Sequence, residues 1–189
     1  MSLAFEDDPV VNWMFPKTLP KRHEDIDGFF RSYLTFITDH GGVVDATPNY
    51  EGIFVWIPPD AEKISEDSYK SFLEDLRSKS GVMGDRAVAV ANALVEQEPA
   101  EVPDPHYHWA FCGIAPQFRG TGVFQTLIEP LARKSEDEGI GVYGEASSPL
   151  NLKLWQRTGF ARIGEEITVP GGGPTFYPIY RLPTPSADQ

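Results

Sequence analysis

Cysteine is almost absent from this sequence, and other common features are missing too. The single cysteine, Cys112, cannot form an internal disulfide. No apolar run approaches the roughly 20 residues that a membrane-spanning helix needs. No basic segment followed by an apolar one opens the chain, so we see no signal peptide. We therefore expect a cytoplasmic protein that does not use a membrane as a partner.

Basic residues are scarce as well. Sixteen lysines and arginines stand against 28 aspartates and glutamates, which gives a net charge of −12. Because binding to phosphate backbones or anionic lipids depends on a basic surface, we expect neither nucleic acid nor membrane as a partner. The acidic surface agrees with a cationic substrate such as an amine, although acidic residues also simply keep a small protein in solution.

What is present suits one globular domain, residues 1–189. Apolar residues make up 41% of the sequence and aromatic residues 12%, which argues against disorder. A chain of 189 residues can bury a core without disulfides or metal.

Apolar periodicity predicts strands that alternate with helices. Residues 1–16 are expected to form a short turn-rich or helical segment, and Pro130 should kink or shorten the helix that contains it. Helices are predicted over residues 26–40, 65–81, 85–96, from 123 onward and 149–157, and strands over 42–47, 52–57, 109–114, 141–146, 165–169 and 175–181. This order, which ends in a hairpin, predicts the α/β class with a mixed sheet.

The stretch from Phe111 to Ile128 combines a strand, a glycine-rich turn and a helix. Pro116 ends the strand, and Arg119-Gly-Thr-Gly122 forms the turn at the start of the helix. Unpaired amides and the positive end of the helix dipole suit an anion there. A P-loop would need a lysine after these glycines, and Gln125 stands where the dinucleotide motif needs its last glycine. A nucleotide-binding domain is therefore disfavoured.

The pattern Ile114-x-Pro116 followed by Arg119-x-x-Gly122 resembles the GNAT superfamily of acyl-CoA-dependent N-acyltransferases. A frame that begins at Gln117 also fits the pattern, but the spacing from Pro116 favours Arg119. The resemblance implies a mixed, mostly antiparallel sheet flanked by helices, and acetyl-CoA as co-substrate. It implies these cofactor-binding residues: Cys112, Gly113, Ile114, Arg119, Gly120, Thr121, Gly122, Val123, Phe124 and Asn151.

A second segment, from Glu145 to Phe160, is similar to the puromycin N-acetyltransferase-like members of the superfamily. Three features depart from the family pattern. The chain starts after the point where the family has its first strand, so it is either truncated or lacks that edge of the sheet. Phe124 replaces a small motif residue. Trp155 stands where the family usually has a tyrosine that can protonate the departing thiolate, a role that an indole cannot fill.

Acyl transfer to an amine requires a neutral amine, a donor to the thioester oxygen and a proton source for the thiolate. Backbone amides of residues 112–114 could polarise the thioester carbonyl. Glu145, near the end of a strand beside the central one, is our first candidate for the base, against a simple solvated carboxylate. His108 is the second candidate, against a packed or surface histidine.

Other chemistries are less well supported. His106 and His108 share one face of a strand, but a metal site would need a third ligand that cannot be placed, so we expect no metal. Cys112 is interpreted as a small buried hydrophobe rather than a nucleophile. No Gly-x-Ser-x-Gly motif supports a serine hydrolase.

The sequence therefore predicts an acetyl-CoA-dependent N-acetyltransferase that acts on a small-molecule amine. The alternative is a degenerate module of the same fold, which binds an acyl-CoA or a partner protein without turnover. Whether the chain forms a homodimer, and which amine it uses, stay open.

Overall fold

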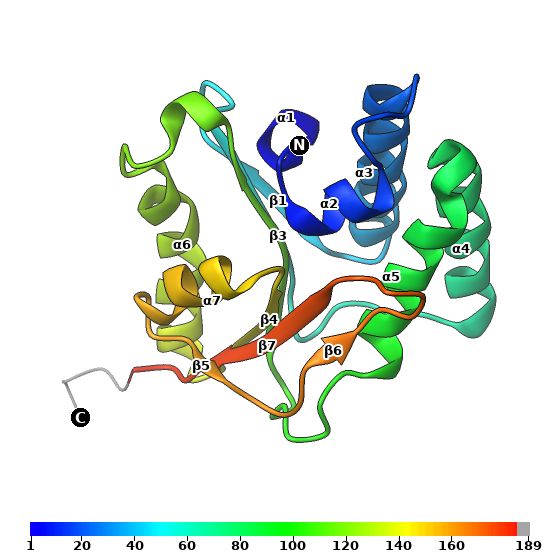
Figure 1. Cartoon of the computed structure of the whole chain (residues 1–189). Helices are drawn as coiled ribbons and strands as arrows, with labels where there is room; N and C mark the ends of the chain where they lie inside the picture. Colours follow the sequence, from blue (N-terminus) through cyan, green and yellow to red (C-terminus); the bar gives the residue numbers. More distant parts are fainter. Residues whose placement is uncertain (185–189) are drawn as a thin grey trace.

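A central sheet separates two groups of helices in the computed structural model, which describes residues 1–184 (Figure 1). The strands lie in the order β1 (Val43–Ala46), β2 (Gly52–Ile57), β3 (Tyr107–Ile114), β4 (Val142–Ala146), β7 (Thr175–Arg181) and β5 (Ala161–Arg162), and β6 (Ile167–Thr168) also pairs with β7. Only β3 and β4 run parallel, and every other pair is antiparallel. The predicted mixed, mostly antiparallel sheet is confirmed.

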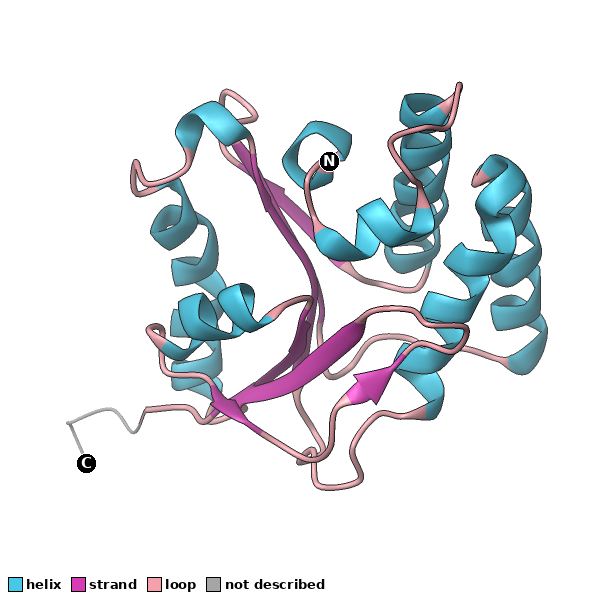
Figure 2. Cartoon of the chain, viewed as in Figure 1, coloured by secondary structure: helices cyan, strands magenta, loops and turns pink. Residues whose placement is uncertain are grey.

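Helices cover both faces of this sheet (Figure 2). The helices are α1 (Ser2–Phe5), α2 (Pro9–Met14), α3 (Arg22–Asp39), α4 (Glu66–Lys79), α5 (Gly84–Glu96), α6 (Val123–Glu138) and α7 (Pro149–Gln156). The helices α6 and α7 lie on one side, and α3, α4 and α5 lie on the other. No helix within residues 1–184 is long and apolar enough to cross a membrane.

Most predicted elements are present with boundaries shifted by a few residues. Ser65 accepts a hydrogen bond from the Ser68 amide and so caps α4, as expected for a serine at this position. The two-residue strand β5 was not predicted. Pro130 was predicted to kink or shorten its helix, and it does not shorten it, because α6 continues through it to Glu138. Pro130 is exposed on α6, so water can satisfy the carbonyl that loses its partner.

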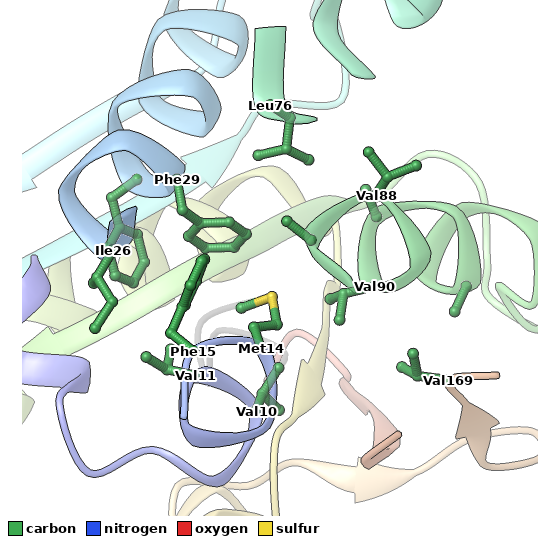
Figure 3. Packing of buried hydrophobic residues seen from close by; sticks show 14 of the residues in the cluster. Val10, Val11, Met14, Phe15, Ile26, Phe29, Leu76, Val88, Val90 and Val169 are labelled. Carbon is green, nitrogen blue, oxygen red and sulfur yellow. The ribbon is translucent and has the colours of Figure 1, made fainter. Parts of the chain in front are cut away.

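Each face of the sheet has its own core. On the α3–α5 side, α2, α3, α4 and α5 pack their apolar faces together and against β6 and β7. Phe15, which directly follows α2, meets Phe29 of α3 and Val90 of α5 in this core (Figure 3). On the other side, Trp109 and Ile179 of the sheet pack with α6 and α7. The sheet therefore holds two separate layers of helices in fixed positions.

The central strand β3 carries a bulge that changes which side chains face which layer. Val55 pairs with Phe111 and Trp56 with Trp109, which leaves Ala110 as an extra residue without a partner. Trp109 and Cys112 consequently share the α6 side, whereas Phe111 packs against Phe30 of α3. Strict alternation would have placed Trp109 and Cys112 on opposite faces.

Beyond the bulge, β3 and β4 part from each other. Their parallel pairing covers Tyr107–Trp109 of β3 and ends where Trp109 faces Gly144. After this point β3 continues beside β2, while β4 continues beside β7. The divergence opens the middle of the sheet from one helical layer toward the other.

Candidate active site

One cavity of about 1430 Å³ runs through the opening between β3 and β4. On one side it reaches the glycine turn before α6 and the start of α7, and on the other it reaches α3, α4 and α5. Of the residues predicted for the site, it is lined by His108, Cys112, Ile114, Arg119, Gly120, Gly122, Phe124, Glu145 and Asn151. Gly113, Thr121 and Val123 do not line it.

The glycine turn has the backbone geometry expected of an anion-binding loop. Gly120 has φ +79° and Gly122 has φ +92°, and neither would meet another atom through an added Cβ. Glycine is therefore required here by backbone conformation and not by crowding. No described residue accepts a hydrogen bond from the backbone amides of residues 122–125, which form the start of α6. These amides and the helix dipole can together bind a phosphate group.

Arg119 has a structural role that its sequence position did not reveal. Its Nη2 donates to the Ala4 carbonyl at 2.9 Å and its Nε to the Ile114 carbonyl at 3.3 Å. The side chain therefore joins α1, the end of β3 and the glycine turn. Any contribution of Arg119 to anion binding comes in addition to this link.

Asn151 belongs to a polar network at the end of β4. Its Nδ2 donates to Ser147 Oγ at 2.8 Å, and Ser147 Oγ donates to Asp8 Oδ2 at 2.7 Å. Asp8 also caps α2 by accepting from the Val10 amide at 2.8 Å. Burial raises the pKa of Asp8, although these hydrogen bonds oppose the change. The network fixes α2 and α7 against the strand end that the cavity passes.

Alternate backbone amides of β3 beyond the bulge also face the opening. The Ala115 amide donates to the Glu51 carbonyl, next to β2. Because successive amides of a strand point in opposite directions, the amides of Cys112 and Ile114 point toward the side that β4 has left. The Gly113 amide points to β2 instead. Of the amides of residues 112–114, which were predicted to polarise a carbonyl, these two point away from β2.

His108 and Glu145, predicted separately as base candidates, form a pair. They come from neighbouring strands, and His108 Nε2 lies 3.1 Å from Glu145 Oε2. The Glu145 side chain is 8% exposed and that of His108 31%. Burial alone would lower the pKa of His108, but the charge and hydrogen bond of Glu145, with Glu98 adding to them, raise it. A proton on Nε2 is held by Glu145, which leaves Nδ1 as the basic nitrogen.

Residues that the sequence did not single out surround this pair. The Tyr143 ring lies 5.1 Å from the His108 ring, and the Tyr143 hydroxyl is buried without a hydrogen-bond partner among the described residues. Burial, with Glu145 nearby, strongly raises the pKa of Tyr143, so the phenol stays neutral. Glu98 lines the cavity from the segment after α5. Tyr143 and Glu145 are two residues apart on one strand and therefore share a face. This spacing was a signal that could have pointed to Tyr143.

The two side chains that depart from the family pattern, Phe124 and Trp155, touch each other. Their rings meet edge to face with centroids 5.1 Å apart. Trp155 is 6% exposed and stacks on Trp109 at 4.2 Å. The bulk of Phe124 and the bulk of Trp155 thus fill one part of the α6 layer together. No titratable group stands at position 155.

The remaining candidate residues are Cys112 and His106. Burial raises the pKa of Cys112 to about 12, which favours the neutral thiol over the nucleophilic thiolate. His106 Nδ1 lies 2.9 Å from the Pro103 carbonyl oxygen, and His108 is paired with Glu145. Within residues 1–184 no group of three or more histidine, cysteine, aspartate or glutamate side chains could hold a metal ion.

Known proteins that resemble this chain in sequence or structure are acetyltransferases. No protein-family model matches the sequence. An uncharacterized N-acetyltransferase of Schizosaccharomyces pombe is 24% identical over 165 residues, which cover 83% of this chain and 66% of that protein. The chain thus spans about two thirds of the length of this curated relative.

Solved structures resemble almost the whole chain. The histone acetyltransferase HPA2 and related acetyltransferase of Corynebacterium glutamicum matches with a TM-score of 0.59 and 19% identity, over 98% of this chain and 88% of that one. Arylalkylamine N-acetyltransferase 2 of Aedes aegypti matches with a TM-score of 0.59 and 12% identity, over 96% and 90%. The chain has the GNAT acetyltransferase fold. At these identities the match establishes the GNAT fold alone, and the chemistry has to be argued from the site.

Proposed function

We propose that the protein is an N-acetyltransferase that transfers an acetyl group from acetyl-CoA to a small-molecule amine. The observation that carries this proposal is the cavity between the diverging strands β3 and β4. It joins unpaired amides at the start of α6 to the His108–Glu145 pair and continues beneath α3–α5. A donor and an acceptor can therefore approach the same point from opposite sides of the sheet.

The residues present fit acetyl-CoA on the α6 side. The amides of residues 122–125 would bind its phosphates, and the space between β3 and β4 would take the arm that carries the thioester. When bound, acetyl-CoA supplies an acetyl group on a thioester, which an amine can attack directly.

The residues of this chain would then act on the amine and on the carbonyl oxygen. His108, oriented by Glu145, accepts a proton from the amine and so frees its lone pair. The amides of Cys112 and Ile114 donate to the carbonyl oxygen as negative charge develops there. The amine nitrogen bonds to the carbonyl carbon, the C–S bond breaks, and the sulfur leaves as a thiolate with the bonding electron pair. The acylated nitrogen then gives up its second proton and the thiolate takes up one proton, by way of water because position 155 offers no acid. The products are an N-acetyl amide and the CoA thiol, and the proton that His108 accepted returns to solvent, so one proton is released in each turnover.

Calorimetry and thiol release test this proposal. Titration with acetyl-CoA should give a binding heat, and an amine panel should produce amine-dependent release of free thiol. Absence of any heat at millimolar acetyl-CoA would remove the cofactor assignment and, with it, the proposed reaction.

One observation favours a second candidate, a domain of the same fold that binds acyl-CoA without turnover. Trp155 is buried against Trp109 and offers no titratable group for the departing thiolate. This candidate predicts a normal acetyl-CoA heat with no thiol release for any amine, whereas the enzyme predicts both.

A further inference from the structure

The part of the cavity beneath α3–α5, which we call the acceptor chamber, has an apolar wall of aromatic and aliphatic side chains. We call its aromatic part the aromatic wall: Phe29, Phe30, Tyr33, Tyr69, Phe72 and Phe111. These rings contact one another: the Tyr33 ring lies 4.9 Å from that of Phe72 and 5.3 Å from that of Phe111. A wall of packed rings favours a flat or bulky apolar group and gives little to a polar one.

Charge is distributed unequally along the same cavity. Glu98 and Glu145, with Glu66 of α4, line it on the chamber side, and Asp7 and Asp8 line it between α1 and α2. The arginines that line it, Arg119 and Arg157, follow β3 and α7 and belong to the opposite side. The Glu145 charge is partly balanced by His108. Glu98, whose side chain is 44% exposed, lies 4.0 Å from His106 and supplies further negative charge.

This arrangement suits one kind of ligand in particular. An ammonium group near His108 and Glu145 would face acidic groups and aromatic ring edges and faces. A carboxylate beside that ammonium group would face the same acidic groups and meet no arginine or lysine of the chamber wall. A second ammonium group deeper in the chamber would lie among rings such as Phe29 and Phe72.

We infer that the acceptor is a small primary amine that carries an aromatic or similarly bulky apolar group and no carboxylate. This inference rests on the proposed function, because it describes the acceptor half of the same cavity. It separates such amines from amino acids and from amines with two cationic ends.

Matched pairs of amines test the inference. We expect kcat/KM for tryptamine to exceed that for tryptophan, and phenethylamine to exceed phenylalanine, by about 100-fold, since a carboxylate would be placed unpaired among acidic groups. The value of kcat/KM for tryptamine should exceed that for agmatine by about 10-fold, because the second cation of agmatine loses its hydration among apolar rings. Equal or better use of the amino acids or of agmatine would overturn the inference while leaving the acetyltransferase assignment intact.

Binding decides the matter if no amine releases thiol. Calorimetry with the protein saturated with CoA should give tryptamine a Kd at least 10-fold lower than that of tryptophan. No tryptamine heat at millimolar concentration would overturn the inference. No acetyl-CoA heat would instead remove the proposed function, so the two failures are distinguishable.

Two variants locate the effect in the chamber. Glu98→Lys should lower the ratio of kcat/KM for tryptamine to kcat/KM for tryptophan about 10-fold. Glu98→Gln should lower this ratio less, because only the lysine supplies a cation for the carboxylate. Glu98 is half exposed, so both proteins should fold. An unchanged preference in Glu98→Lys would contradict the charge argument.

The aromatic wall is tested at Phe72. Phe72→Leu should raise KM for tryptamine several-fold and leave the Kd of acetyl-CoA unchanged. The matched control is Tyr177→Leu, which removes a ring from β7 outside the cavity and should leave both unchanged. Equal effects of the two substitutions on KM would contradict a role for the wall in amine recognition.

Discussion

The two sides of the cavity are built from different chemical groups. On the α6 side, the groups placed to meet a ligand are main-chain amides, held by glycines with positive φ at positions 120 and 122. On the α3–α5 side, they are side chains from several helices and strands, such as Tyr33, Phe72 and Glu98.

This difference teaches how the two sides can change. A loop of amides depends on backbone conformation, so it tolerates few substitutions at its glycines and many elsewhere. A wall of side chains can change one residue at a time, at a cost in stability where the residue also belongs to the core, as Phe29 does. We expect the α6 side to control donor affinity and the α3–α5 side to control the choice of amine.

The largest expected effect comes from the pair that lies between the two sides. Glu145→Gln or His108→Asn should lower kcat by ~10²-fold or more, because general-base catalysis typically contributes that much. Acetyl-CoA affinity should change little, and calorimetry checks this. The control Glu166→Gln alters an exposed carboxylate and should keep wild-type kcat. Undiminished kcat in both variants over about pH 6 to 9 would remove the pair from catalysis.

The pH profile of the reaction separates the roles of the two partners. Since the pKa of His108 is raised above its ordinary value of 6.5, the rate should rise with pH through a value above 6.5. Glu145→Gln removes the main group that raises the pKa of His108, while Glu98 remains, so the rising limb of the pH–rate profile should move to lower pH if His108 is the base. If Glu145 is the base, the limb should disappear. The stability that the pair contributes is complete below the unfolded-state pKa and is lost as pH rises through the folded-state pKa of His108.

A substitution in the glycine turn should affect only the donor. Gly122→Asp adds a Cβ at φ +92° and a negative charge beside the unpaired amides. We expect acetyl-CoA to bind roughly 10- to 100-fold more weakly, as the sum of backbone strain and repulsion, with an unchanged KM for the amine. Gly171→Asp is the matched control, because Gly171 has φ +75° and open space in another loop. An equal loss in the control would assign the effect to folding.

The contact between Phe124 and Trp155 should behave as a unit. Trp155→Tyr removes part of a ring stacked on Trp109 and buries a hydroxyl, so we expect a loss of about 1–3 kcal/mol of unfolding free energy. In a double-mutant cycle with Phe124→Ala, the coupling should be at least about 0.5 kcal/mol. Denaturant unfolding measures both.

The turnover of the Trp155→Tyr variant tests whether position 155 has lost an acid that protonates the thiolate. A rise in turnover would mean that a lost thiolate acid had been restored. A level or lower turnover would mean that another group protonates the thiolate. In the double-mutant cycle, additive changes in unfolding free energy would mean that the rings of Phe124 and Trp155 do not form one packing unit.

The smallest expected effect is at Tyr143. Its buried hydroxyl has no partner among residues 1–184, so Tyr143→Phe should leave the melting temperature unchanged or slightly higher. Tyr107→Phe is the comparison, because the Tyr107 hydroxyl donates to Glu138 and its loss should cost about 1 kcal/mol. Calorimetric melting of both proteins tests this, and a clear destabilisation by Tyr143→Phe would show that the hydroxyl has a partner in solution.

The sequence predicted best what is local in the chain. The strand, turn and helix around Gly122 lie within one short stretch, and apolar periodicity identified α3, α4 and α5. The pairing of His108 with Glu145 was not predicted, although each was a candidate, because it depends on the parallel register of β3 and β4.

What could not be predicted depends on contacts between distant segments. Nothing in the sequence around Ala110 announces a bulge, since the extra residue is defined only against β2. Strand β5 is two residues long and carries no periodicity. The acceptor chamber draws on Tyr33, Phe72 and Phe111, which come from separate elements, so no contiguous pattern marks it.

The bulge at Ala110 also bears on how this chain can vary in length. Val55 already pairs with Phe111 and Trp56 with Trp109, so removing Ala110 would leave a regular ladder in which Phe111 and Cys112 keep their present faces. The amides of Cys112 and Ile114 would still point away from β2. What the deletion would remove is the local bend and the added twist that a bulge gives a strand. We therefore expect deletion of Ala110 to change how β3 diverges from β4, and so the width of the opening, more than it changes which side chains face each helical layer.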